Sequence, residues 1–493
     1  MSCVRRVLLF AVAIAAACRK AQEPAGPSVT ALPKGDAVEF LSPAAAAEPD
    51  LVDRLRRLAI ATVFLPAGEL ARDGGRWTFQ ADPNPPRPVA GPAVILVVRP
   101  SEALSVLLSS SEGTAAPAAS HALAAGVTDA LRKGGPYGNV IGIHVEGPFS
   151  AATAARGAEL FSALRKDLPR GALLSVRLAS APANDDERKR LTPLLESVDA
   201  FGATVFGGTA RVDSVAADAL GRPWWAGYDA ATRCVVTGPD GQVRGEVPEK
   251  AVDALTGNPQ IDFENDLTVT DPDVVAFRLT ARGPVRSGDL TLQAGEHVAC
   301  RMPSLPEMLY RLGSAMAGRH HLLGRLAVFG GDGEADRIVR VEALEDILLG
   351  RSLTPALDVA VHPAGRNAIS VEARNLSPHS STASRMSNWV EVDLAPAHPA
   401  DVSLGGFDRY EAYDSAGRPV TPGRATRVRL YETLIGPREA ITPARIVVRG
   451  ALPSPCCRHR LHVLAAAGPE ESGDWVDPPP PPTPPPAPTK KRK

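Results

Sequence analysis

Apolar, strand-like segments alternate with helical patterns over about 300 residues of this 493-residue chain, and this alternation limits the fold most strongly. Continuous apolar runs are typical of parallel strands that helices cover on both faces. The strand-like segments are 59–65, 94–99, 140–146, 173–179, 198–205, 223–228, 274–280 and 323–329. Helical stripes separate many of them, for example Leu160, Phe161, Leu164 and Leu168 after Ser150.

Eight strands that alternate with helices predict an α/β fold, an irregular (β/α)8 TIM-like barrel over residues 48–352. The irregularity is expected at 230–300, where Pro239-Asp240-Gly241 reads as a hairpin turn between extra extended segments. A doubly wound open sheet is the alternative fold. After the barrel region, segments that alternate apolar and polar residues predict an all-β sandwich domain at 353–468. The remainder, 469–493, contains nine prolines between Pro478 and Pro488 and predicts a disordered tail with a basic end.

The N-terminus predicts export. Arg5 and Arg6 precede the apolar run Val7–Ala17, which is too short to span a bilayer and is typical of a signal peptide over residues 1–17. Cys18 follows three alanines, and this arrangement resembles the lipobox of bacterial lipoproteins. The resemblance implies cleavage before Cys18, acylation of that residue and a flexible tether over 18–47. The protein would then reside in the cell envelope, on a membrane through its lipid anchor. A plain signal peptide is the alternative.

Charge and cysteine content exclude several classes of protein. The formal net charge of −1 argues against a nucleic-acid binder. No apolar run of about 18 residues follows the N-terminus, so no transmembrane helix is predicted. Cys234 and Cys300 form a candidate disulfide in an exported protein. No C-x-x-C pair or Cys/His array indicates zinc, and we predict neither a metal site nor a cofactor.

The segment Val140–Phe149 is the first place to look for chemistry. Successive side chains of a strand face opposite sides, which we call the parity of the strand. Here the parity predicts that Ile141, Ile143 and Val145 face the helices, so that Gly142, His144 and Glu146 point into the barrel. Glu146 would then stand at the carboxyl end of its strand, where barrel enzymes place catalytic residues. By the same parity, the next strand turns Ser175 and Arg177 inward, and later strands add Arg278 and Arg325.

Glu146 is the predicted acid or nucleophile, and Arg177 the neighbour that tunes its charge. Glycoside hydrolysis requires a second carboxylate, for which Asp229 is preferred to Asp332 or Glu334 because Asp229 closes a strand. The predicted substrate-binding residues are His144, Trp224, Trp225, Tyr228 and Asp332; aromatic faces suit sugar rings. Two alternatives remain open: the aromatic side chains belong to the core, and the Glu–Arg group is an inert buried network.

Several segments resemble an uncharacterised family of exported bacterial proteins whose TIM-type barrel is related to glycoside hydrolases. The resemblance covers about 140–350 and lies in the 140–146 strand, Leu160–Pro169, Leu173–Val176, Val198–Phe201 and Gly324–Phe329. Aspartates are usual in this family where the chain has His144 and Glu146. The resemblance implies an exported lipoprotein that acts on, or binds, a carbohydrate or another envelope polymer. A non-catalytic binding or structural lipoprotein is the alternative, and a metal-dependent hydrolase is disfavoured by the few histidines.

Overall fold

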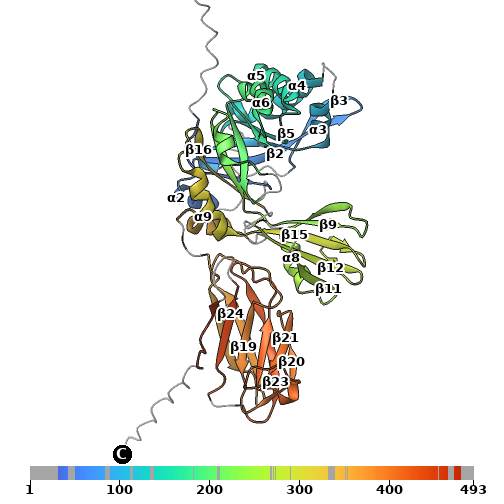
Figure 1. The fold of residues 1–493 in the computed structure, drawn as a ribbon, viewed down its shortest axis with the longest axis vertical. Coiled ribbons are helices and arrows are strands. Elements are labelled where there is room, and N and C mark those ends of the chain that lie inside the picture. Colours follow the sequence, from blue (N-terminus) through green and yellow to red (C-terminus); the bar gives the residue numbers. More distant parts are fainter. Residues whose placement is uncertain are drawn as a thin grey trace, which may run out of the picture.

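The computed structural model describes residues 32–478, except 43–49, 84–88, 111–114, 134–137, 181, 208–210, 267–268, 270, 272–273, 289, 331–338, 350, 352, 453–454 and 465–470. Figure 1 shows three parts: an α/β barrel, a smaller antiparallel sheet beside it and a β-sandwich at the other end. The predicted signal peptide, Cys18, Asp332 and residues 479–493 lie outside the described residues. No described helix has the length and apolar character needed to cross a membrane.

Eight parallel strands close into the predicted barrel. They are β1 (Ala37–Phe40), β2 (Thr62–Asp73), β4 (Val89–Arg99), β5 (Gly138–Phe149), β6 (Leu173–Leu178), β7 (Ala200–Phe206), β8 (Trp224–Asp229) and β16 (Leu322–Phe329). Closure occurs at β1, which pairs in parallel with β16 on one side and with β2 on the other. β3 (Arg76–Ala81) extends β2 as an antiparallel hairpin outside the barrel.

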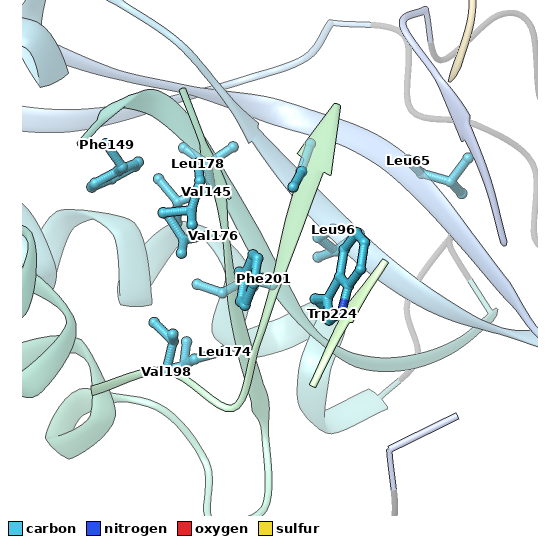
Figure 2. Packing of buried hydrophobic residues seen from close by; sticks show 14 of the residues in the cluster. Leu65, Leu96, Val145, Phe149, Leu174, Val176, Leu178, Val198, Phe201 and Trp224 are labelled. Atoms are coloured by element: carbon cyan, nitrogen blue, oxygen red, sulfur yellow. The ribbon is translucent and has the colours of Figure 1, made fainter. Parts of the chain in front are cut away.

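Helices cover the outside of the barrel. They are α2 (Leu51–Arg57), α3 (Glu102–Ser109), α4 (Ala115–Lys133), α5 (Ala154–Asp167), α6 (Asp185–Ser197), α7 (Ser214–Asp218), α9 (Leu305–Met316) and α10 (Leu344–Leu349). Their apolar faces meet the outward side chains of the strands in one core, part of which Figure 2 shows around Val145, Val176 and Phe201. A second, smaller cluster fills the barrel interior around Phe64, Trp225 and Leu326. Two layers of apolar packing therefore fix the strands that carry the inward polar residues.

The sequence-based strand assignment is wrong at two places. Residues 274–280 belong to β12 (Val274–Ala281), an antiparallel strand outside the barrel, and the missing barrel strand is Ala37–Phe40. That strand lies within 18–47, the predicted flexible tether. Four residues are too short to give a strand pattern, whereas β12 has the composition of a strand whichever sheet it joins.

The parity prediction for β5 holds with one exception. Ile143 and Val145 lie in the helix-side core, as expected, but Ile141 packs against the interior cluster. The register explains the difference: Val94 pairs with Val140 and Ile95 with Gly142, so the strand has one extra residue at Ile141. A bulge of this kind reverses the side-chain parity before it and leaves the parity after it unchanged.

A small α/β unit, which we call the insert, lies between β8 and β16 in the chain. Its five-stranded antiparallel sheet has the order β10 (Val243–Val247), β9 (Arg233–Thr237), β15 (His297–Pro303), β12, β11 (Ile261–Asn265). Helix α8 (Glu249–Thr256) and the hairpin β13 (Val285–Ser287)–β14 (Leu290–Leu292) complete it. The predicted disulfide between Cys234 and Cys300 is confirmed and joins β9 to β15. In Figure 1 the insert lies between the barrel and the sandwich.

The C-terminal part is the predicted sandwich. One sheet has the order β17 (Leu357–Pro363), β18 (Ala368–Asn375), β23 (Ala440–Arg449), β20 (His398–Ser403). The other has the order β21 (Arg409–Tyr413), β22 (Arg427–Tyr431), β19 (Trp389–Asp393), β24 (His459–Val463), β25 (Glu471–Ser472). The predicted tail therefore begins too early, because Glu471–Ser472 pairs with β24 and Val476 with His459. Ala383 and Leu434 of the sandwich pack into the core of the insert.

Candidate functional site

A cavity of about 640 Å³ opens at the carboxyl ends of the barrel strands. The barrel contributes Glu39, Glu146, Arg177 and Asp229 to its lining, and strands β9, β10, β12 and β15 of the insert form the facing wall. The wall is charged as well, since it presents Arg233, Glu246 and Arg301. This is the end of a barrel at which enzymes place their chemistry, and the volume falls in the range of small-ligand sites.

Arg177 lies between two carboxylates. Its Nε is 2.6 Å from Oε1 of Glu146, and its Nη2 forms an ion pair with Oε2 of Glu39. Both acids therefore pair with the same guanidinium group, and the charge of Glu146 acts on Glu39 as well. Glu39 is 1% exposed, whereas the side chain of Glu146 is 16% exposed and reaches the cavity. The predicted convergence of Glu146 and Arg177 therefore occurs, and a second acid joins them.

The surroundings of Glu39 change its pKa. Burial, reinforced by the charge of Glu146 and opposed by Arg177, raises the pKa of Glu39 to about 8. Burial alone would lower the pKa of Arg177, but the charges of Glu39, Glu146 and Asp229 raise it. At neutral pH, Glu39 therefore holds a proton beside Glu146, which pairs with Arg177. We call Glu39 and Glu146 the dyad, because both pair with the same guanidinium group.

Glu39→Gln is expected to flatten the pH dependence of stability. The folded protein binds the Glu39 proton more tightly than the unfolded chain, so its stabilisation is complete below about pH 4.5 and is lost as the pH rises through about 8. An amide cannot ionise, so the variant should lose roughly 1–3 kcal/mol less than the wild type between about pH 5 and pH 8.5. Urea denaturation at the two pH values measures this, with Glu372→Gln on the exposed face of β18 as control. The same pH dependence in all three proteins would contradict the assignment.

Asp229 lies at the end of β8, as predicted, and lines the cavity. Its Oδ1 accepts the backbone N–H of Ala231, and its Oδ2 accepts Nε of Arg233 at 3.1 Å. Its charge also acts on Arg177, so Asp229 is electrostatically connected to the dyad. Both hydrogen bonds fix the orientation of the carboxylate at the cavity wall.

His144 points into the barrel, as parity predicts, but lies below the cavity. Its ring is fully buried, its Nδ1 is 2.9 Å from Oγ of Ser175, and its edge meets Phe64. Burial, with the nearby charge of Arg177, lowers the pKa of His144 well below its usual value. The predicted substrate-binding role is therefore wrong in this structure, because His144 does not line the cavity and other side chains cover it.

The predicted aromatic platform is also wrong. Trp224 and Trp225 are fully buried and Tyr228 is 2% exposed. Trp224 stacks on Phe201 in the helix-side core, while Trp225 meets Phe64 edge-on inside the barrel. These rings stabilise the barrel and have no face available to a sugar. The alternative, that they are core residues, is the correct one.

Two of the arginines expected at the site lie elsewhere. Arg278 is on β12 of the insert and pairs with Asp266 at 3.7 Å. Arg325 is near the start of β16, where Nη2 lies 2.5 Å from Oδ2 of Asp36. Asp332 lies outside the described residues. Of the predicted residues, the structure thus brings together Glu146, Arg177 and Asp229.

Glu39 is the site residue that sequence reasoning missed. Its strand was assigned to the tether because Ala-Val-Glu-Phe is short and follows a segment rich in Ala, Pro and Gly. One signal was present: Ala37, Val38 and Phe40 surround the acid with apolar residues, which is unusual in a solvated tether. Among the described residues, no group of three or more His, Cys, Asp or Glu side chains is placed to hold a metal ion.

No protein-family model and no curated protein matches this chain. Among solved structures, the spore cortex-lytic enzyme SleL of Bacillus cereus aligns over 65% of this chain and 75% of its own, at 13% identity and a TM-score of 0.39. The chitinase domain of the spore coat protein CotE from Clostridium difficile aligns over 59% and 86%, at 12% identity and a TM-score of 0.26. The endo-β-N-acetylglucosaminidase of Cordyceps militaris aligns over 43% and 70%, at 15% identity and a TM-score of 0.26. We transfer no residue role from these alignments.

Proposed function

We propose that this protein hydrolyses glycosidic bonds in a glycan of the cell envelope or its surroundings, with the cavity at the barrel mouth as active site. The dyad carries the proposal: Glu39 keeps a proton to about pH 8, and Glu146 beside it pairs with Arg177 and reaches the cavity. Carboxyl groups whose environments separate their proton affinities are typical of acid–base catalysis. Arg177 fixes both groups and balances their charge.

Glu39 and Glu146 do not flank the scissile bond, because the side chain of Glu39 is 1% exposed and cannot reach a sugar in the cavity. The accessible member, Glu146, therefore donates the shared proton to the glycosidic oxygen, and that oxygen leaves as a hydroxyl. Asp229 is the base that accepts a proton from water as the water oxygen bonds to the anomeric carbon. Glu39 supplies Glu146 with its proton and does not touch the substrate.

The anchoring of the protein forms part of the proposal. Cleavage after residue 17 and acylation of Cys18 would hold the barrel at a membrane surface, within reach of envelope polymers. Mass spectrometry of the N-terminal peptide from cells that export the full chain tests this. A diacylated Cys18 is the expected result, and an unmodified chain that begins elsewhere would contradict it.

Glycan binding without catalysis is the second candidate. It is favoured by the burial of Glu39 and by the mutual pairing of Glu39, Arg177 and Glu146, as in an ion-pair network that fills the barrel mouth. In that case the cavity would hold a sugar while the acids serve only as structure.

Reducing-end release separates the two candidates. The full chain is incubated with chito-oligosaccharides, purified sacculi and neutral plant glucans between about pH 4 and pH 9, and products are identified by mass spectrometry. If the protein is a hydrolase, new reducing ends should be released from at least one glycan. The rate of release should fall above about pH 8, where Glu39 loses its proton. Binding of a glycan by calorimetry with no release at any pH would contradict hydrolysis and support the binding role.

A further inference from the structure

Two arginines lie side by side on the insert wall of the cavity, opposite the barrel. We propose that Arg233 and Arg301 form an anion subsite that binds a carboxylate or phosphate group of the ligand. This inference rests on the proposed function in placing a glycan in the cavity, and it adds that this glycan is acidic.

The strand register sets the two arginines next to each other. Arg301 of β15 is the direct partner of Arg233 of β9, so both side chains leave the same face of the sheet, and both line the cavity. One residue along, Cys300 is the partner of Cys234, and the disulfide between them holds the two strands in this register. The disulfide belongs to the opposite face and to the core of the insert. The covalent link therefore fixes the spacing of the arginine pair.

Such a pair is unfavourable without a ligand. Like charges directly opposite each other on neighbouring strands destabilise a sheet. Arg233 is partly balanced, since its Nε donates to Asp229 and Glu246 lies nearby. Within the part of the chain that the structure describes, no side chain forms an ion pair or hydrogen bond with the half-buried Arg301. Because Arg301 lines the cavity, its N–H donors remain available to a ligand there.

The charge around the cavity favours an anion as well. Four arginines line the described part of the cavity, namely Arg99, Arg177, Arg233 and Arg301. The lining acids are Glu39, Glu146, Asp229 and Glu246, of which Glu39 is protonated at neutral pH. Arg99 pairs with Asp82, Arg177 with the dyad and Arg233 with Asp229, so that Arg301 is the arginine of the described lining whose charge no acid pairs with. A planar guanidinium binds carboxylate or phosphate oxygens through two parallel hydrogen bonds, and this geometry suits an acidic sugar.

Two disaccharides that differ by one lactyl carboxylate test the subsite. Calorimetry compares N-acetylglucosamine–N-acetylmuramic acid with di-N-acetylchitobiose, on the full chain and on Arg301→Gln. We expect the wild type to bind the acidic disaccharide at least tenfold more tightly, and Arg301→Gln to lose that preference without weaker binding of chitobiose. Arg286→Gln, on the exposed hairpin of the same insert, is the matched control and should behave as wild type.

Phosphate distinguishes the two sources of negative charge. If N-acetylglucosamine 6-phosphate binds more tightly than the acidic disaccharide, and Arg301→Gln abolishes this binding, the ligand group is a phosphate; the reverse order indicates a carboxylate. Equal affinity of the wild type for chitobiose and for both anionic probes, or unchanged affinities in a folded Arg301→Gln variant, would overturn the subsite. Absence of measurable binding to every anionic probe would also overturn it. If the protein prefers anionic ligands but cleaves no glycan, the anion subsite is supported and the proposed hydrolysis is contradicted.

Discussion

Replacing Glu146 with glutamine is expected to lower kcat by about 10²–10⁴-fold on whichever glycan the wild type cleaves. Glutamine keeps the size of the side chain and lines the cavity, but it carries no proton to donate to the leaving oxygen. Substrate affinity should change little, because the loss concerns the transition state and not ground-state binding. Initial rates and KM, measured at the pH of maximal wild-type activity, separate these two effects.

Two other variants make the result specific to the dyad. Glu372→Gln, exposed on β18 of the sandwich, should retain full activity. Glu39→Gln should lower kcat less than Glu146→Gln and change the fall in rate near pH 8, because the amide has no ionisable proton to supply to Glu146. An active Glu146→Gln variant would remove Glu146 from the chemistry. A Glu39→Gln variant with an unshifted pH profile would show that Glu39 is only structural.

The sequence predicted the barrel well because its evidence is local and repeated. Continuous apolar runs such as Leu173–Leu178 and the helical stripe around Leu160 each bury one face, and the two periodicities identify strand and helix separately. Parity then placed Glu146 and Arg177 inside the barrel without knowledge of their neighbours. The bulge at Ile141 shows the limit of this reasoning, since one extra residue reverses the parity before it.

The remaining features depend on contacts between distant residues. β1 is recognisable as a barrel strand only through its pairing with β2 and β16, and the second pairing joins residues at opposite ends of the barrel sequence. Glu39 was missed with it. The wrong assignment of β12 has the same explanation. β12 has the composition of a strand, and only its pairing with β11 and β15 places it outside the barrel. A residue such as Trp225 likewise has the composition of a sugar platform until its neighbours show that it is enclosed.

Replacing Arg177 with methionine is expected to lower the free energy of unfolding at pH 7 by about 3–5 kcal/mol. Methionine fills much of the space but removes the charge that Glu39 and Glu146 share. Two carboxyls then remain in a partly desolvated site without a cation, and a buried charge that has lost its partner is costly. Lysine should restore only part of the loss, because a single ammonium group cannot contact both acids as Nε and Nη2 do.

The dependence of this loss on pH and on its partners identifies its cause. The difference in stability between Arg177→Met and wild type should shrink in acid, because protonated carboxyls need no cation. For the same reason, combining Arg177→Met with Glu39→Gln and Glu146→Gln should recover most of the stability at pH 7, since neutral side chains need no cation. Arg286→Met on the exposed hairpin controls for the loss of an arginine. If the triple variant were as unstable as Arg177→Met alone, the arginine would stabilise the barrel mouth by packing and not by balancing the dyad, and the electrostatic basis of the proposed proton donor would be lost.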